Sequence, residues 1–345
     1  MSADADTPSD RLVDRVAGSR LKQWLLLAAD RWLVTGLLLG IIFCVLVGVG
    51  SLTPGGAAAV RSGDPVETLF QGLLTATITG VTLVLTLNQL VLSQELGAAG
   101  DQRDRMAGAM AFREDVASEI GTAVSPARPA QFLRALVDVA GKRAAALRDA
   151  VPETADPELR AEITDLTDSL TDNADRVSAG LDGAQFGSFG VVSAALNFNY
   201  SWKIFAARRI NERYDDSLSP DASDALDELI GVLKLFGPAR EHFKTLYFQW
   251  ELINLSQQIL VVSVPALLVS AVMIAFFDAA DYGGAVVGVD TVVLAVAAAT
   301  TLALLPFLLL IAYVMRIATV TKHTLSIGPF ILRETDGVSE VEWDQ

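Results

Sequence analysis

One uninterrupted apolar stretch, from Leu69 to Glu95, most constrains what this chain can fold into. It contains no charged residue before Glu95. At about 1.5 Å of rise per residue, a helix of this length can cross the roughly 30 Å hydrocarbon core of a lipid bilayer. The stretch therefore predicts a membrane-spanning helix.

Polar side chains recur along this stretch at steps of three and four residues, and most other positions are Leu, Val or Ile. Such steps place the polar side chains on a single face of a helix. We call this face the polar stripe. Its members are Thr75, Thr79, Thr82, Thr86, Gln89 and Ser93.

Two interpretations of the polar stripe stay open from the sequence. In the first, the stripe packs against other helices, because Thr and Ser hydroxyls can donate to backbone carbonyls one turn earlier and are tolerated in lipid. In the second, copies of this helix from several subunits line an aqueous path. No acidic or basic residue lies in the middle of this or any other predicted span, which argues against a proton-coupled transporter.

Three further apolar blocks are long enough to span a bilayer. They cover residues 32–52, 252–277 and 291–315. The first contains the spacing Gly36-xxx-Gly40, which lets another helix approach closely. The other two contain Pro265 and Pro306, which can kink a helix because proline removes a backbone donor.

The four spans divide the chain into segments and define the predicted fold class. This class is all-α: an integral membrane protein with four transmembrane helices and a helical cytoplasmic domain between spans two and three. About 150 residues are available for that domain, which is enough for a small core. The predicted segments are a tail with an interfacial amphipathic helix (1–31), spans one and two (32–95), the cytoplasmic domain (96–250), spans three and four (251–316) and a second tail (317–345).

Proline and polar residues shape the predicted cytoplasmic domain. Helices from Pro129 to Ala150 and from Pro157 to Leu181 each begin with proline in the first turn, where it is favoured. Residues 184–202 are uncharged, but we assign them to a buried or interfacial helix, because their glycines, serines and asparagines make a poor membrane span. We expect Pro238 to interrupt the helix that leads into the third span.

Basic residues near the ends of the spans predict the orientation. All but one lie at the span ends that adjoin the two tails and the middle domain; the two short loops contain only Arg61. By the positive-inside rule, both termini and the middle domain are cytoplasmic and the spans lie in the plasma membrane. The basic residues counted on the cytoplasmic side are Arg20, Lys22, Arg31, Arg103, Arg105, Lys244, Arg316 and Lys322.

Amide side chains gather at the predicted inner ends of the second and third spans. They are Asn88, Asn254, Gln257 and Gln258. Amides at similar depths can hydrogen-bond across helices, and such bonds average about 0.6 kcal/mol. We therefore expect this amide cluster to orient the helices more than to stabilise them.

Composition argues against several functions. The chain has 41 acidic and 26 basic residues, for a net charge of −15, which disfavours nucleic acid as a partner. Cys44 is the single cysteine, and His242 and His323 have no further His or Cys at metal-ligand spacing. Since phosphate-loop, nucleophile-elbow and HExxH motifs are also lacking, we expect no catalytic residues, no metal, no cofactor and no enzyme activity.

The layout resembles that of bestrophin-type anion channels, in which two spans, a helical cytoplasmic domain and two more spans follow one another with both termini inside. This resemblance implies a pentamer whose pore is lined by the second span. The aromatic and basic signature that follows the second span in bestrophins is replaced here by Ser93-Gln-Glu-Leu-Gly97 and Gly100-Asp-Gln-Arg103. No pore residue is therefore carried over. The segment LTLNQLVLSQELGAAGDQRDRM resembles an uncharacterised family of haloarchaeal membrane proteins. The acidic, Ala- and Asp-rich composition resembles that of salt-adapted archaeal proteins.

The sequence supports two functional hypotheses. The first is a homo-oligomeric ion channel or pore lined by the second span, with the lipid bilayer and other copies of the chain as partners. The alternative is a non-conducting membrane scaffold or sensor whose cytoplasmic domain binds another protein. Oligomeric state separates the two, because a ring of subunits can enclose a path, whereas a single four-helix subunit is filled by its own side chains.

Overall fold

The computed structural model describes residues 24–184 and 189–324. Within these residues the regular secondary structure is helical except for a short antiparallel ribbon, in which β1 (Ala285–Val286) pairs with β2 (Val289–Asp290). The chain forms two compact units. The span unit comprises residues 24–96 and 249–320, and the middle unit is built from residues 97–184, 189–248 and 321–324.

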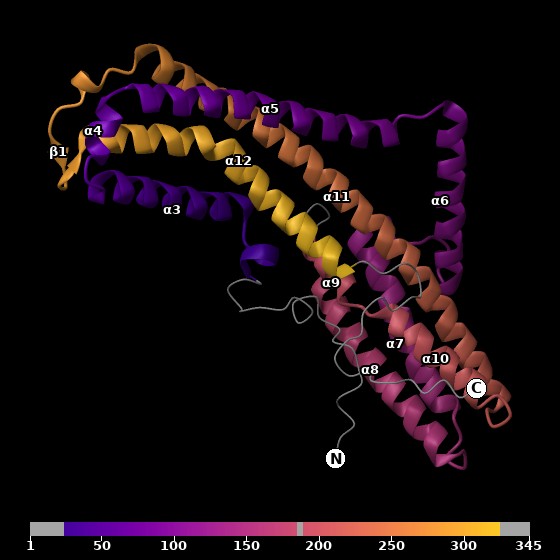
Figure 1. The fold of residues 1–345 in the computed structure, drawn as a ribbon. Coiled ribbons are helices and arrows are strands. Elements are labelled where there is room, and N and C mark those ends of the chain that lie inside the picture. Colours follow the sequence, from indigo (N-terminus) through magenta and orange to yellow (C-terminus); the bar gives the residue numbers. More distant parts are fainter. Residues whose placement is uncertain (1–23, 185–188, 325–345) are drawn as a thin grey trace, which may run out of the picture. The chain divides into compact units, whose positions relative to one another are not determined.

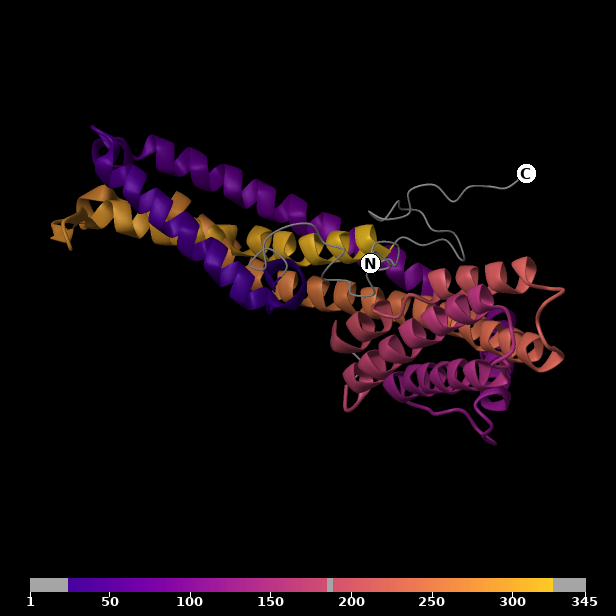
Figure 2. The same ribbon diagram turned by 90° about the horizontal axis from the view of Figure 1, so that it is seen from below.

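The span unit holds the long apolar helices, which lie alongside one another in Figures 1 and 2. Four helices of the described chain, α3, α5, α11 and α12, are long and apolar enough to cross a membrane. The predicted all-helical chain with four such helices is therefore confirmed. The elements of this unit are η1 (Trp24–Ala28), α3 (Arg31–Leu52), α4 (Gly56–Arg61), α5 (Asp64–Glu95), the last part of α11 (Pro220–Phe276), η2 (Ala279–Asp281) and α12 (Thr291–Thr324).

Helix α5 packs against α11 and α12 through two apolar clusters. Near its start, Val66 and Phe70 share a buried cluster with Met273 of α11 and Val296 of α12. Further along, Val84 packs with residues of the same two helices. That second cluster contains Leu255, Ile259, Val262, Leu309 and Tyr313. Large apolar side chains stay exposed on the outward faces of the span unit, which suits a surface surrounded by lipid.

The middle unit is a bundle of helices around one apolar core. Leu133 and Leu136 of α7, and Leu170 of α8, are fully buried there, because both helices carry apolar residues at steps of three and four. The first part of α11 completes the core with Leu226, Leu229 and Leu233. The other helices of this unit are α6 (Ala99–Glu119), α7 (Pro129–Ala150), α8 (Pro157–Leu181), α9 (Phe189–Leu196) and α10 (Tyr200–Arg213).

Two sequence predictions concern the middle unit directly. The expected interruption at Pro238 is wrong, since α11 is one continuous helix from Pro220 to Phe276. Phe236 and Ala239, on either side of the proline, are both buried in the core, and this packing offsets the roughly 3 kcal/mol that proline costs inside a helix. In the predicted segment 184–202, the described residues form α9 and the start of α10, with Phe198 fully buried.

Some predicted segments fall outside the described residues. These are residues 1–23, which include most of the expected amphipathic surface helix, and residues 325–345 of the second tail. The described part of the chain starts with η1, which is followed by Asp30 as the cap of α3: its carboxylate accepts from the Trp32 amide.

Candidate functional site

Helix α5 packs through one face and presents the polar stripe on the opposite face. The packing face consists of buried Val66, Phe70, Thr77, Val84 and Val91. At about 100° per residue, the polar stripe lies about half a turn away from this face. All six members of the polar stripe are exposed. The four helices of one chain therefore leave the polar stripe uncovered.

The hydroxyls of the polar stripe donate their protons within their own helix. Thr82 Oγ1 donates to the carbonyl of Ile78, and Thr86 Oγ1 to that of Thr82, both at 2.9 Å. Thr75, Thr79 and Ser93 make equivalent bonds. A hydroxyl has one donor and two acceptor lone pairs. Because the donors of these side chains are already used, only their oxygen lone pairs are available to water or a ligand.

The stripe continues toward the start of α5. Counting back from Thr75 by four, three and four residues gives Gln71, Thr68 and Asp64, and all three are exposed. These three residues, or in the case of Gln71 its place in the series, were not part of the predicted polar stripe, which was counted within the apolar block that begins at Leu69. The same spacing, followed past that point, would have found them. We call Asp64, Thr68 and Gln71 together with the polar stripe the extended stripe.

Local sequence explains why α5 begins at Asp64. Gly63 has a φ of 82°, a left-handed conformation that favours glycine, and it turns the chain out of α4. Pro65 follows in the first turn, where its missing amide proton costs nothing. Two acids, Asp64 and Glu67, lie in this first turn, and Gln71 Nε2 donates to Glu67 Oε1 at 2.9 Å.

The predicted amide cluster is spread over more than one environment. Asn88 is half-buried on the packing side of α5, Asn254 and Gln258 are half-buried on α11, and Gln257 is exposed. Within the described residues, no hydrogen bond joins any of these four amides to another. Gln258 instead lies beside Tyr313 of α12. A functional role for the amide cluster stays a prediction.

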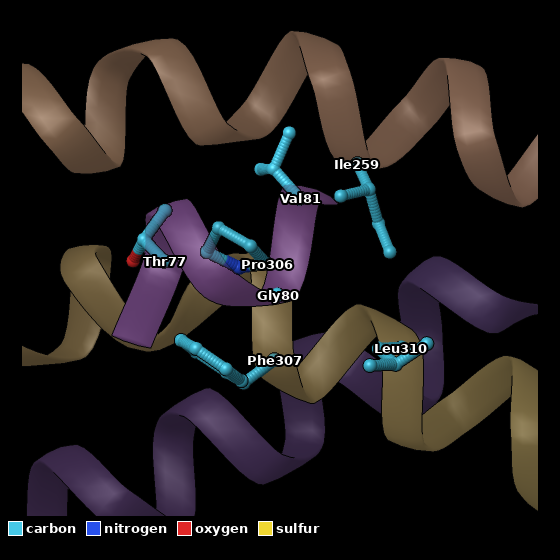
Figure 3. Close-up of a pocket in the computed structure, with 7 residues that line it drawn as sticks. All are labelled: Thr77, Gly80, Val81, Ile259, Pro306, Phe307 and Leu310. Atoms are coloured by element: carbon cyan, nitrogen blue, oxygen red, sulfur yellow. The ribbon is translucent and has the colours of Figure 1, made fainter. Parts of the chain in front are cut away.

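A small cavity lies on the packing side of α5, away from the polar stripe. Figure 3 shows its lining by α5, α11 and α12, with Pro306 and Phe307 facing Gly80. A Cβ atom at Gly80 would lie 3.4 Å from the Phe307 ring, which is an ordinary van der Waals contact, so the helices pack closely here without requiring glycine. The cavity has a volume of about 10 Å³. Since that is about the space of one water molecule, it is a packing gap and not an aqueous path.

At one end of the span unit, α3 connects to α4 and α11 connects to α12. We call this end the loop end. A single guanidinium, that of Arg61, joins the two connections. Arg61 Nη2 donates to both carboxylate oxygens of Asp290, at 2.7 and 2.8 Å. The same side chain donates to the carbonyls of Ala279 and Tyr282, at 3.3 and 3.2 Å. Arg61 therefore links α4 to both η2 and β2.

The link predicts how the loop end responds to mutation. Replacing Arg61 with Gln removes the ion pair and most of the bonds to the facing loop. We expect amide hydrogen exchange of residues 279–291 to become severalfold faster at pH 7. Arg61→Lys should give an intermediate result, because one ammonium cannot replace a fork of five donors. Asp281→Asn, in the same loop, is the control, and equal exchange in wild type and Arg61→Gln would contradict the assignment.

The same ion pair sets a pH dependence. The hydrogen bond from Arg61, followed by that from the Val292 amide, lowers the pKa of Asp290 below its ordinary value of 3.8. A carboxylate whose pKa is lowered by folding stabilises the folded loops above its ordinary pKa. That contribution is lost as the pH falls through the lower, folded value. In the exchange experiment, the effect of Arg61→Gln should therefore persist at every pH above 3.8 and shrink in stronger acid.

Charged side chains are buried at the other end of the span unit. Arg31 of α3, Glu251 of α11 and Arg316 of α12 are each more than nine-tenths buried. Arg316 Nη2 donates to the carbonyl of Ala29 at 2.6 Å, and Arg31 Nη1 donates to that of Ala312 at 3.4 Å. These reciprocal bonds fasten the start of α3 to α12.

The described residues offer little else to a ligand. No group of three or more His, Cys, Asp or Glu side chains among them is arranged to hold a metal ion. Cys44 is exposed on α3 and forms no disulfide. The extended stripe on α5 is therefore the strongest candidate site.

These features define a helical protein with four helices suited to crossing a membrane, one of which carries an exposed polar face. The chain belongs to the Family of unknown function (DUF7972), whose family model matches residues 1–345. No curated protein and no solved structure matches the chain. Since the description of the family states no activity, function has to be argued from the site.

Proposed function

We propose that this protein is a homo-oligomeric ion channel of the plasma membrane, in which α5 helices from several copies surround a water-filled path. The observation that carries the proposal is the exposure of the polar stripe on the side of α5 opposite its packing face. Within a single chain, the described residues give this face no protein partner. A second copy, or water enclosed by a ring of copies, would supply one.

Lipid is a poorer partner for this face than water. The hydroxyls tolerate lipid because their protons are already bonded to backbone carbonyls. The amide of Gln89 is different, since each unsatisfied polar group in hydrocarbon costs several kcal/mol. Large apolar side chains flank the stripe on both sides, among them Leu83 and Leu85, which are 57% and 40% exposed. Such flanks suit contacts between neighbouring copies around a central path.

The proposed orientation places both termini and the middle unit in the cytoplasm, and the loop end outside. The distribution of basic residues supports it, since Arg61 is the one basic residue of the two loops. The order of spans and helical domain, which resembles that of bestrophin-type channels, also supports an arrangement in which the second span lines the path.

Ion flux through the purified full-length protein in liposomes tests the proposal. The informative variant is Thr82→Leu/Thr86→Leu, which replaces acceptor oxygens with larger apolar groups in the middle of the path. We expect flux to fall by about tenfold or more, because a hydrophobic constriction excludes water from a narrow pore. Thr82→Val/Thr86→Val keeps the side-chain volume and removes only the oxygens, so it should give a smaller loss.

A matched control is available on another helix. Thr301 of α12 makes the same type of bond, from its Oγ1 to the carbonyl of Ala297 at 2.7 Å, but lies outside the stripe. Thr301→Val should therefore leave flux unchanged. Subunit number is to be measured in the same preparations. A folded, inserted wild-type protein that conducts no ion, or that is monomeric, would refute the channel proposal.

The alternative, a non-conducting scaffold or sensor, is favoured by one observation in the middle unit. Residues 99–111 of α6 are exposed on every side, and only its last turns pack, through Val116 and Ala117. Met106 and Met110 are 67% and 46% exposed. A cytoplasmic protein that binds this helix would cover the exposed Met106 and Met110, and this function would replace the channel if the flux experiment fails.

A further inference from the structure

We infer that the proposed path selects cations over anions, and that Asp64 at the start of α5 is the residue that sets this preference. The inference rests on the channel proposed above and adds the class of permeant ion. It is carried by three observations: the position of Asp64 on the helix, the balance of charge at the loop end, and the hydrogen bonding of the stripe.

Asp64 lies on the same face of α5 as the polar stripe. It precedes Thr75 by eleven residues, which is about three helical turns, so the two side chains point in nearly the same direction. Its side chain is exposed, and no described residue forms an ion pair with it. If several copies surround a path with this face inward, their Asp64 carboxylates form a ring at its entrance. Rings of Asp or Glu are the arrangement by which cation channels attract their ions.

The loop end as a whole carries an excess of negative charge, which is the same sign as the charge of Asp64. Its one guanidinium, that of Arg61, is already committed to the Asp290 carboxylate. Four further carboxylates at this end have no basic residue in either loop to neutralise them. They belong to Asp64, Glu67, Asp278 and Asp281. An excess of negative charge at an entrance raises the local concentration of cations and lowers that of anions.

Hydrogen bonding along the stripe gives a separate reason to expect a preference for cations over anions. An anion needs N–H or O–H donors, whereas a cation needs oxygen lone pairs. The hydroxyl donors of Thr75, Thr79, Thr82 and Thr86 are used by carbonyls of their own helix. The amide of Gln71 donates to Glu67. The face is thus rich in acceptors, and Gln89 is the one member of the polar stripe with N–H donors.

Asp64 can also have a simpler role, stabilisation of the helix, and this role has to be distinguished from ion selectivity. An acid in the first turn of a helix also interacts favourably with the helix dipole. That role is shared with Glu67, does not depend on the face of the helix, and affects stability. Selectivity depends on the face. Ion preference is therefore the measurement that distinguishes the two roles.

The experiment is the reversal potential of the full-length oligomer in planar bilayers under a tenfold KCl gradient. Wild type should show a potential of the sign expected for potassium, which approaches about 59 mV for ideal selectivity at this gradient. Asp64→Asn should lower the potassium-to-chloride permeability ratio about fivefold or more, as expected for removing a nearby unit charge. Asp64→Lys should lower it further, and Asp64→Glu should preserve it.

The control variant is Asp281→Asn, which removes one carboxylate from the same end of the span unit but not from α5. It should change the permeability ratio much less than Asp64→Asn. An equal change in both variants would show that the selectivity comes from diffuse surface charge and not from a ring of Asp64 carboxylates, and it would overturn the assignment. A chloride-selective wild type, or an Asp64→Asn oligomer with unchanged selectivity, would overturn the inference while leaving the channel intact. Absence of flux for every ion would instead remove the channel proposal and this inference with it.

Discussion

Replacing Phe198 with Ala will destabilise the middle unit by about 3–5 kcal/mol, the typical cost of removing a fully buried phenylalanine ring. Phe198 has no exposed surface, and its ring meets that of Phe236 edge to face at a centroid distance of 4.7 Å. The Lys203 ammonium, on a side chain that is only 1% exposed, lies 5.6 Å from the same ring. The mutation therefore leaves a cavity and also removes a cation–π contact from a buried lysine.

Hydrogen exchange of the full-length protein measures this effect. Amides of α9 and α10 that exchange through opening of the whole unit should exchange about a hundredfold to several thousandfold faster. Met106→Ala is the control, because it also shortens a large side chain in the middle unit, but one that is 67% exposed. Equal protection in wild type and Phe198→Ala would show that Phe198 is not part of the stabilising core.

Replacing Arg316 with Met will loosen the start of α3 from α12. The substitution keeps most of the side-chain length but removes the donor to the Ala29 carbonyl, and Ala29 is itself buried. A buried carbonyl left without a partner costs about 1–3 kcal/mol. We expect amide exchange over residues 24–35 to rise roughly tenfold, with little change at the loop end. Lys322→Met, at an exposed position near the same end of α12, should have no such effect. Equal exchange in Arg316→Met and Lys322→Met would contradict the proposed link.

The four helices that are long and apolar enough to cross a membrane could be predicted from the sequence, because hydrophobic length is a local property. The predicted block at 32–52 corresponds to α3, which begins one residue earlier, and the block at 291–315 corresponds to the first part of α12. The prediction at Pro238 failed for the opposite reason. Whether a proline ends a helix depends on the packing around it, and the burial of Phe236 and Ala239 involves residues that are distant in sequence.

The candidate site shows a similar division. The spacing of Thr75, Thr79 and Thr82 was enough to place them on one face of a helix. It was not enough to tell which face packs, because Val66, Phe70 and Val84 find their partners on α11 and α12. Thr77 illustrates the difference: it is a threonine of the same helix with the same type of backbone bond, yet it is 1% exposed and lies on the packing face.

The backbone bonds of the stripe hydroxyls also bear on the order in which such a protein is made. A helix whose hydroxyl protons are satisfied within its own turns can sit in lipid before any other subunit arrives. Thr79, Thr82 and Thr86 each have this bond in the single chain. In the channel proposed above, newly inserted subunits would therefore be able to accumulate in the bilayer and meet by diffusion, and assembly would not have to accompany synthesis.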